Sequence, residues 1–472
     1  MTLIFKITKW GTMSIVALSL MSCGDNSSIN ESLTIIEKEN SLYTDLTWEE
    51  ETPTNVGINP TLLEDSFIYA LADETYTQSA IIIKDEKLIY EKYRGLETEE
   101  LNLWNQSIAE ILELGIEIPQ ELQDGFINRD RYSLVTSWST AKSFVSILIG
   151  IAIDQGYIQS VDESASTYIT EWSNDNRNEI TIRNLLDMRS GLPGLCATGS
   201  QPNYKLDVCP YPVHWSGGNL TLVQNQLDAC INREIAETGV IQSWYSSERT
   251  WEKDYLLYSN CEAQVLGELL FRATGKDLQS YADINLFSKI GFEGHWWRDN
   301  ENNGQSNGNY LAYCCLDATA RDFAKFGQLI LNNGSWGNEQ IVSSSYVEKI
   351  KKIGIDSVVK EDGSYYSYGM FFWTLGPTQQ EDGTDFPPAN KILLMWGYDG
   401  QYIILDIENN MVLVRNSLYY PMQFASFDRK MIATGDLNAI NYPNTLPVGW
   451  FGNYSSFSPS VFLYLVSKSL NK

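Results

Sequence analysis

Residues 144–153 are apolar at nearly every position, which is the pattern of a helix buried on all sides. Gly156 follows closely and is the kind of residue that commonly ends a helix. The residues just before the run, 137–143, include three serines, a threonine and one lysine. The pattern therefore predicts a buried helix that begins with polar, chemically capable side chains.

Periodic segments on either side of this helix predict the other elements. Residues 60–71 have helical spacing, and residues 79–84 and 87–93 alternate about a turn at Asp85 and Glu86, as in a β-hairpin. Residues 96–130 are acidic and aperiodic, and we interpret them as an insertion. Further helices are predicted within residues 180–192, 262–273, 319–331 and 459–470, and further strands at residues 368–375, 392–395, 401–407 and 411–416.

The order of these elements predicts the fold class. Strands near both ends of the chain enclose a mainly helical block at about residues 139–350. Such an order favours one antiparallel sheet assembled from distant parts of the chain, with helices packed on it and a second, helical subdomain beside it. We therefore expect an α/β (α+β) protein.

Composition narrows the possible functions. The chain has 472 residues, of which 43% are apolar, so it can bury a large core. It carries 33 basic and 60 acidic residues, and this balance argues against binding to nucleic acid. His214 and His295 are its only histidines, so a histidine-based metal cluster or a Ser-His-Asp triad is not favoured. A nucleophilic serine here would need lysine or tyrosine as its base.

The N-terminus has the features of an export signal. Lys6 and Lys9 precede a short apolar run and then Cys23, as in a bacterial lipoprotein signal peptide with Cys23 as the acylated first residue of the mature chain. An ordinary signal peptide or a short anchor is the alternative. We expect a signal peptide at residues 1–22, a polar tether at 23–50, the folded domain at 51–435 and an extension with a final helix at 436–472.

Export would change how the cysteines are interpreted. Apart from Cys23 there are six, and an oxidising compartment favours disulfides among them, with 15 possible pairings. Cys196 with Cys209 is the favoured pair because it would close a proline-containing insert. The adjacent residues Cys314 and Cys315 remain unassigned, and the other two are Cys230 and Cys261.

Ser139 and Lys142 are the candidate chemical centre. They lie three residues apart at the start of the buried helix, so both side chains project from the same side. Unpaired N–H groups at a helix start can bind an oxyanion, and an amine beside a hydroxyl there is disfavoured as ammonium, so it can accept the proton of the serine. The alternative is an N-cap serine followed by an exposed lysine.

Two other sequence matches compete with this site. A second Ser-x-x-Lys occurs at residues 469–472, where no helix follows. Residues 304–308 match Gly-x-Ser-x-Gly, the nucleophile elbow of α/β-hydrolases, with Ser306 as the serine. That elbow requires a hydrophobic strand before it, whereas this match lies in a polar, asparagine-rich segment and has no suitable histidine after it.

The chain resembles the serine β-lactamase and penicillin-binding-protein superfamily, in particular its class C β-lactamase, esterase and 6-aminohexanoate-dimer-hydrolase branch. The resemblance spans about residues 60–420 and rests on four stretches in a fixed order. These are Ser-Trp-Ser-Thr-Ala-Lys-Ser-Phe at 137–144, residues 180–192, Tyr-Ser-Asn at 258–260 before a helix ending in Thr-Gly, and Gly-Tyr-Asp-Gly-Gln at 397–401.

The resemblance implies a role for each matching residue. Ser139 is the expected acylated nucleophile, with Lys142 and Tyr258 as its proton-transfer partners. Asn260 is expected to be a polar ligand for the substrate or the lysine. No metal or other cofactor is implied.

The third motif departs from the family pattern. Where the family usually has Lys-x-Gly or His-x-Gly, this chain has Tyr398, Asp399 and Gly400, so the usual cation is missing. These positions and Gln401 are expected to contact the substrate, with the N–H groups of Gln401 and Ser139 forming the oxyanion hole. Placing Trp396 in the motif is the other possible alignment.

The resemblance implies a serine hydrolase, and the N-terminal signal predicts that it is exported to the bacterial cell envelope and tethered to the membrane only by its N-terminal lipid. Its substrates would be small esters, amides or peptides. A β-lactamase or D-alanyl-D-alanine carboxypeptidase is the alternative within the same chemistry. An alternative of another class is a catalytically inactive, penicillin-binding-like lipoprotein that binds or regulates.

Overall fold

The computed structural model describes residues 48–418 and 457–471, except for residue 99 and residues 103–104, 106–123, 125, 193–196, 199–200, 203–224, 234–257, 299–307, 354–356, 360–364, 376–377, 380–384 and 387–390. Residues 48–472 form one compact unit. Among the residues described, no helix has both the length and the apolar character needed to cross a membrane.

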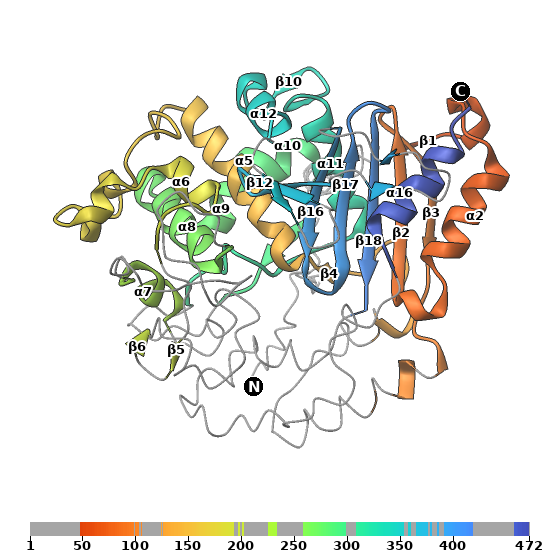
Figure 1. Cartoon of the computed structure of the whole chain (residues 1–472), viewed down its shortest axis with the longest axis horizontal. Helices are drawn as coiled ribbons and strands as arrows, with labels where there is room; N and C mark the ends of the chain where they lie inside the picture. The colour runs from red at the N-terminus through yellow and green to blue at the C-terminus, as the bar shows by residue number, and fades with distance from the viewer. Residues whose placement is uncertain are drawn as a thin grey trace, which may run out of the picture. The chain divides into compact units, whose positions relative to one another are not determined.

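The core of the fold is a nine-stranded sheet in the order β1-β3-β2-β18-β17-β16-β13-β12-β11 (Figure 1). Three strands come from early in the chain, β1 (Glu49–Glu50), β2 (Thr77–Lys84) and β3 (Lys87–Tyr93), and the other six follow residue 356. Strand β18 (Met411–Ser417) pairs with β2 and joins the two groups. All neighbours are antiparallel except β1 and β3. The sheet built from distant parts of the chain is therefore confirmed.

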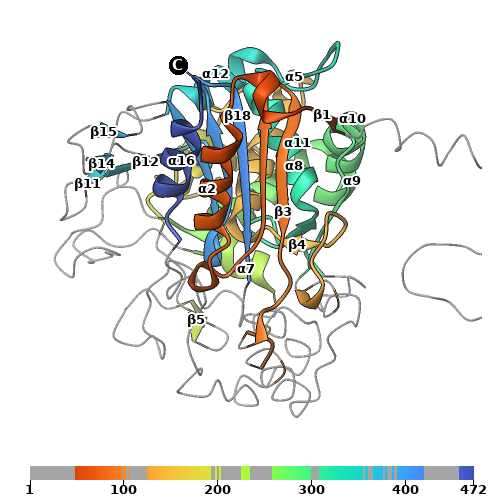
Figure 2. The same ribbon diagram turned by 90° about the vertical axis from the view of Figure 1, so that its right-hand side faces the viewer.

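Two helices cover one face of the sheet. Helix α2 (Pro60–Ala70) and the C-terminal helix α16 (Pro459–Lys468) pack against each other and lie in front of the strands in Figure 2. Their buried residues, among them Phe67 and Phe462, form one apolar cluster with Ile82 and Leu413 from the sheet. Asn59 and Ser458 accept backbone N–H groups at the two helix starts, where each helix has proline at its first position.

The other face carries the predicted buried helix. Helix α5 (Ala141–Asp154) is buried at every position from 141 to 152, as its apolar pattern predicts. The Phe144 ring stacks on Phe326 of helix α11 (Ala320–Leu331), with 3.6 Å between ring centroids. Gly327 lets α11 approach the sheet, because a Cβ there would stand 2.6 Å from Val412. Helix α8 (Asn260–Thr274) packs on the other side of α5 and ends, as predicted, at Gly275.

The remaining strands of the sheet are β11 (Ser357–Val359), β12 (Tyr365–Gly369), β13 (Phe372–Leu375), β16 (Ile392–Gly397) and β17 (Gln401–Asp406). The smaller elements include β4 (Val135–Thr136), β7 (Gly294–Trp296), β8 (Leu316–Ala318), β9 (Ser335–Trp336), β10 (Glu339–Gln340), α6 (Ile182–Leu186), α7 (Gln226–Ile231), α9 (Leu278–Ala282), α10 (Ser288–Ile290) and α12 (Ser344–Lys351).

One predicted strand is wrong. The sequence predicts a continuous strand at residues 368–375, but the chain turns at Met370 and Phe371, so that β12 and β13 form a hairpin. Both turn residues have positive φ, 50° and 63°. The turn is held from outside, since Asp187 accepts the N–H of Met370 at 2.8 Å and Ser143 donates to the carbonyl of Phe371 at 2.7 Å. Tertiary contacts therefore override the extended preference of these side chains.

Candidate active site

Ser139 lies where the chain enters helix α5. Residues Trp138–Thr140 form the short 3₁₀ turn η4, which runs directly into α5. Trp138 has a φ of +47°, an unfavourable value for a bulky residue and one that often marks a functional turn. The Ser139 side chain is half-buried, and its N–H makes no hydrogen bond to any described residue. A reactive hydroxyl and a free N–H therefore meet at a helix start.

Lys142 is buried directly beside that hydroxyl. Its Nζ lies 2.8 Å from the Ser139 Oγ and donates to the Tyr313 carbonyl, also at 2.8 Å. The residue is only 1% exposed. Burial lowers the pKa of the Lys142 amine well below its usual value, because a charged ammonium loses its hydration there. A neutral amine has the lone pair that a general base needs.

Tyr258 completes a group of three side chains. Its hydroxyl is hydrogen-bonded to Ser139, and its ring centroid lies 5.0 Å from the Lys142 Nζ. Burial raises the pKa of the Tyr258 phenol, an effect that the Ser139 hydrogen bond partly opposes. The ring stacks on Trp373 at 5.5 Å and meets Tyr368 edge-on at 5.6 Å. The phenol is thus a neutral proton donor in a fixed position.

Asn260 lies close in sequence but does not hold the lysine. It is the first residue of α8 and is half-buried, and within the described residues no hydrogen bond joins it to Lys142. The second partner of Lys142 is instead the backbone carbonyl of Tyr313. The Tyr313 hydroxyl donates to the Oε1 of Gln226 at 2.7 Å, which fixes this residue at both ends. Sequence reasoning missed Tyr313 because any residue type can supply a carbonyl.

The third motif faces the nucleophile turn. A Cβ at Gly397 would stand 2.3 Å from the Ser137 carbonyl and 3.2 Å from Trp138, so only glycine allows this approach. The Tyr398 ring meets the Trp138 ring edge-on at 5.9 Å. Burial raises the pKa of the Tyr398 phenol, so the group is neutral where the family usually has a cation.

Trp396, the alternative residue for this motif, lies elsewhere. Its ring packs on Trp373 at 5.9 Å and on Tyr402 at 6.0 Å, and the side chain is 36% exposed. It makes no ring contact with Trp138 among the described residues. The alignment through Tyr398 is therefore the one that brings the motif to Ser139.

Gln401 is more constrained than the sequence indicates. Residues Tyr398–Gly400 form the turn η11, in which the Gln401 N–H donates to the Tyr398 carbonyl. The Gln401 side chain is also occupied, because its Nε2 donates to the Ser417 carbonyl at 3.0 Å and its Oε1 accepts the Ser417 N–H at 3.1 Å. The side chain thus ties β17 to β18 and does not extend toward Ser139. A substrate oxyanion would have to share the N–H with Tyr398.

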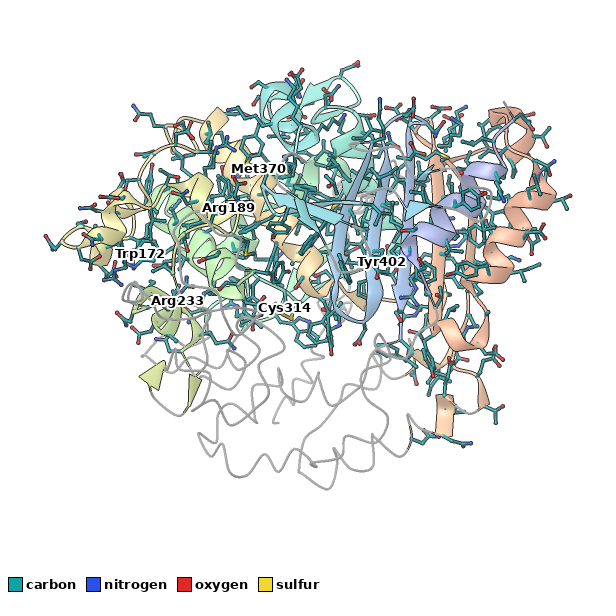
Figure 3. The ribbon with its side chains drawn as sticks, in the orientation of Figure 1. Trp172, Arg189, Arg233, Cys314, Met370 and Tyr402 are labelled. Carbon is teal, nitrogen blue, oxygen red and sulfur yellow. A yellow bond between two sulfur atoms is a disulfide. The ribbon has the colours of Figure 1, made fainter. Side chains whose placement is uncertain are left out.

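Two disulfides lie in the described part of the chain. One joins Cys230 to Cys261, and the other joins the neighbouring residues Cys314 and Cys315. In the view of Figure 3, Cys314 lies between Arg233 and Tyr402. The Cys314–Cys315 pair directly follows Tyr313 in the chain, so a covalent constraint adjoins the carbonyl that binds Lys142.

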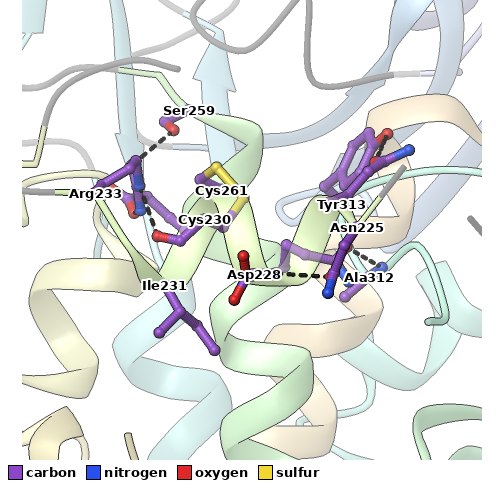
Figure 4. The surroundings of a disulfide bond; sticks show 12 residues. Asn225, Asp228, Cys230, Ile231, Arg233, Ser259, Cys261, Ala312 and Tyr313 are labelled. Carbon is purple, nitrogen blue, oxygen red and sulfur yellow. Dashed lines mark hydrogen bonds and ion pairs between the residues drawn. A yellow bond between two sulfur atoms is a disulfide. The ribbon is translucent and has the colours of Figure 1, made fainter. Parts of the chain in front are cut away.

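The other disulfide belongs to a buried polar network that includes Ser259 (Figure 4). Arg233 forms an ion pair with Glu262 at 2.6 Å and donates to the Cys230 carbonyl at 3.0 Å. It also donates to the hydroxyl of Ser259, the residue after Tyr258, at 3.4 Å. An ion pair this deeply buried is costly to break, so the network should hold the start of α8 in place.

Several predicted features lie outside the described residues. These are the signal peptide, Cys23, the Cys196–Cys209 pair, His214 and Ser306. Within the described residues, no cluster of three or more His, Cys, Asp or Glu side chains could hold a metal ion.

The fold agrees with the comparisons. The family model Beta-lactamase matches residues 78–424, and the chain therefore belongs to this family of β-lactamase-fold serine hydrolases. No curated protein matches the sequence.

Solved structures share the fold at low sequence identity. A Bacillus anthracis protein assigned as a 6-aminohexanoate-dimer hydrolase is 21% identical with a TM-score of 0.51, over 78% of this chain and 81% of that one. A Bacteroides dorei protein assigned as a β-lactamase is 16% identical with a TM-score of 0.54, over 87% and 98%. EstCE1, described as a hydrolase with promiscuous acyltransferase activity, is 15% identical with a TM-score of 0.50, over 78% and 97%.

Proposed function

We propose that this protein hydrolyses small esters or amides through an acyl-enzyme on Ser139. The observation that carries the proposal is the buried Lys142 amine 2.8 Å from the Ser139 Oγ, with the Tyr258 hydroxyl on the same oxygen. The neutral base Lys142 and the neutral proton donor Tyr258 then both contact the nucleophilic oxygen of Ser139. The named hydrolases among the structural neighbours are consistent with this chemistry.

The proposed reaction has two stages. Lys142 accepts the Ser139 proton as the Oγ attacks the substrate carbonyl carbon, and negative charge develops on the carbonyl oxygen. Tyr258 is placed to pass a proton to the leaving alcohol or amine as the tetrahedral adduct collapses to the acyl-enzyme. Water then attacks the acyl carbon and gives a proton to the Tyr258 phenolate. Lys142 returns its proton to the Ser139 Oγ as the acyl bond breaks and the acid is released.

A non-catalytic binding lipoprotein is the second candidate. It is favoured by two departures from the family pattern, namely the neutral Tyr398 and the Gln401 N–H that is bound within its own turn. A binding module, however, does not need a buried lysine beside a serine, and burying that amine is costly. We therefore prefer the enzyme.

Covalent labelling with a fluorophosphonate separates the two candidates. Wild-type protein should be labelled and should hydrolyse p-nitrophenyl butyrate, whereas Ser139→Ala should do neither and should keep its melting temperature. Ser306→Ala, which alters the competing motif, is the control and should behave as wild type. Equal labelling of wild type and Ser139→Ala would exclude Ser139 as the nucleophile, and an unlabelled wild type would favour the binding module.

We also propose that the protein is an exported lipoprotein. The support is the signal-like N-terminus ending at Cys23 and the two disulfides in the described part of the chain, since disulfides persist mainly in oxidising compartments.

A further inference from the structure

Arg415 is a buried cation whose hydrogen bonds reach the turn beside the nucleophile. It lies on β18 and is 1% exposed. Its guanidinium donates through Nη1 to the carbonyls of Gly400 at 2.7 Å and Asp399 at 3.2 Å, and through Nε to the Thr77 hydroxyl at 2.8 Å. Nη2 donates to the Thr75 carbonyl. Within the described residues, no carboxylate forms an ion pair or hydrogen bond with Arg415.

This placement is costly for a purely structural role. Burial lowers the pKa of Arg415 to about 10, so the group stays charged at neutral pH in spite of the lost hydration. Its hydrogen-bonding partners are neutral oxygens, and two of these belong to successive peptide groups of the turn η11. A neutral side chain would avoid burying a charge but would leave these carbonyls without donors. The guanidinium carbon also lies 4.3 Å from the centroid of the Phe457 ring, and the position of the charge beside η11 needs an explanation.

The geometry of the peptide group explains why a charge is placed here. The carbonyl of Gly400 and the N–H of Gln401 belong to the same peptide group, and in a trans peptide they point in opposite directions. A cation on the carbonyl therefore fixes the direction of the N–H and makes its hydrogen more positive, as in a hydrogen-bonded chain. The same holds for the Asp399 carbonyl and the Gly400 N–H.

The close approach of Arg415 also explains the residue at 400. A Cβ on Gly400 would stand 2.4 Å from the Arg415 Nη1, and Gly400 has a φ of +82°. The neighbouring Asp399 has a φ of +56°. In the turn η11, Asp399 and Gly400 therefore both have left-handed backbone conformations, and the turn packs on the Arg415 guanidinium. Gly397, just before η11, approaches the turn that carries Ser139.

We propose that Arg415 is a positioning residue for the oxyanion hole, which orients and polarises the Gln401 N–H through the Gly400 carbonyl. Without substrate, the Gln401 N–H donates to the neutral Tyr398 carbonyl. A developing oxyanion is a stronger acceptor than this carbonyl and therefore accepts the hydrogen bond from the Gln401 N–H instead. Arg415 keeps the peptide group of Gly400 and Gln401 in place during this exchange. The inference rests on the proposed acyl-enzyme function and names the part of the structure that stabilises its transition state.

The test compares two changes at Arg415 with a matched buried arginine. Arg415→Met keeps the volume and removes the charge, and Arg415→Lys keeps the charge but cannot bind two carbonyls as a fork. The control is Arg129→Met. Arg129 is 7% exposed, and its Nη1 and Nη2 also donate to neutral oxygens, which belong to Leu134 at 2.7 Å and Gln78 at 3.0 Å and lie outside η11.

The measurements are kcat and KM for p-nitrophenyl butyrate, inhibition by phenylboronic acid and the melting temperature. Loss of one oxyanion donor costs about 10²- to 10³-fold in kcat, so weakening one should cost roughly 10- to 100-fold. We expect Arg415→Met to lower kcat and boronate affinity together by that factor with little change in KM. For Arg415→Lys, kcat and boronate affinity should lie between those of the wild type and Arg415→Met. Arg129→Met should lower only the melting temperature.

The outcomes are decisive in either direction. A folded Arg415→Met with wild-type kcat and wild-type boronate affinity would overturn the inference, and so would equal losses of kcat in Arg415→Met and Arg129→Met. If Arg415→Met does not fold, Arg415→Lys decides, because wild-type kcat and boronate affinity there would show that the fork is unnecessary. Failure of the proposed function would look different, since wild-type protein would then be inactive.

Discussion

Lys142 illustrates how function and stability oppose each other at a single residue. Its neutral amine is what makes Ser139 a nucleophile, yet an amine in this place loses the hydration that it has in the unfolded chain. Between the lowered pKa of Lys142 in the folded protein and its ordinary pKa of about 10.4, the unfolded chain binds a proton on this lysine that the folded protein does not bind. The unfolded state then holds more protons, so the free energy of unfolding rises with pH.

Replacing Lys142 should therefore separate activity from stability. Lys142→Met should reduce hydrolysis by at least about 10²-fold, the usual cost of losing a proton-transfer partner, while raising the melting temperature at neutral pH. The stability gain should shrink as the pH rises through about 10.4, because both states hold a neutral amine above that value. Thermal melts of both proteins at several pH values, together with ester hydrolysis, provide the measurement.

Lys352→Met is the control for this prediction, because the Lys352 side chain is 79% exposed and lies outside the site. It should change neither activity nor the pH dependence of melting. A Lys142→Met protein that melts below wild type at neutral pH would contradict the assignment of a neutral, destabilising amine.

At the scale of the elements, the predictions succeeded where local signals were complete. Helix α11 has its threonine cap at Thr319, and α6 has a full capping box between Thr181 and Asn184, so both starts could be read from the sequence. The β12–β13 hairpin could not, because its turn has no proline or asparagine at Met370 and Phe371 and depends on Asp187 and Ser143 from other elements.

The same distinction applies to the candidate site. Ser139 and Lys142 could be proposed because the chemistry requires those side chains at a helix start, and Tyr258 could be proposed from the resemblance to the β-lactamase superfamily. The Tyr313 carbonyl and Arg415 could not, because a backbone oxygen has no sequence signal and a buried arginine on a strand has no local pattern. The structure brings these two groups to the site from residues far from Ser139 in the chain.

At the scale of the whole molecule, charge should influence the choice of substrate. The formal net charge is −27, and Tyr398 offers a neutral phenol where relatives usually have a cation for a substrate carboxylate. A lost charge-assisted hydrogen bond weakens binding by about 1.5 to 3 kcal/mol, and a negative field slows an approaching anion. We therefore expect a higher kcat/KM for p-nitrophenyl butyrate than for a chromogenic cephalosporin.

Tyr398→Lys tests the source of this preference and should narrow the ratio of the two kcat/KM values, whereas Tyr398→Phe should leave it near the wild-type ratio. If the kcat/KM of the wild type were about tenfold or more higher for the cephalosporin, another cation would bind the carboxylate, and Tyr398 would not set the substrate preference.

Export is the other property of the whole molecule that can be tested directly. Mass spectrometry of protein from a bacterial envelope, without reduction, should find an acylated Cys23 and no free thiols among the other six cysteines. Cys23→Ser should lose the acyl mass and remain uncleaved. Six reactive thiols in exported wild-type protein would refute the predicted oxidising compartment.

The bond between Cys314 and Cys315 has a practical consequence for anyone who prepares this protein. We expect production in a reducing cytosol to leave two thiols beside Tyr313 and to give that short segment more backbone freedom. It would also leave the Cys230–Cys261 bond unformed, so two preparations of the same purity should differ in melting temperature and in specific activity. The oxidation history of a sample should therefore be recorded together with its concentration.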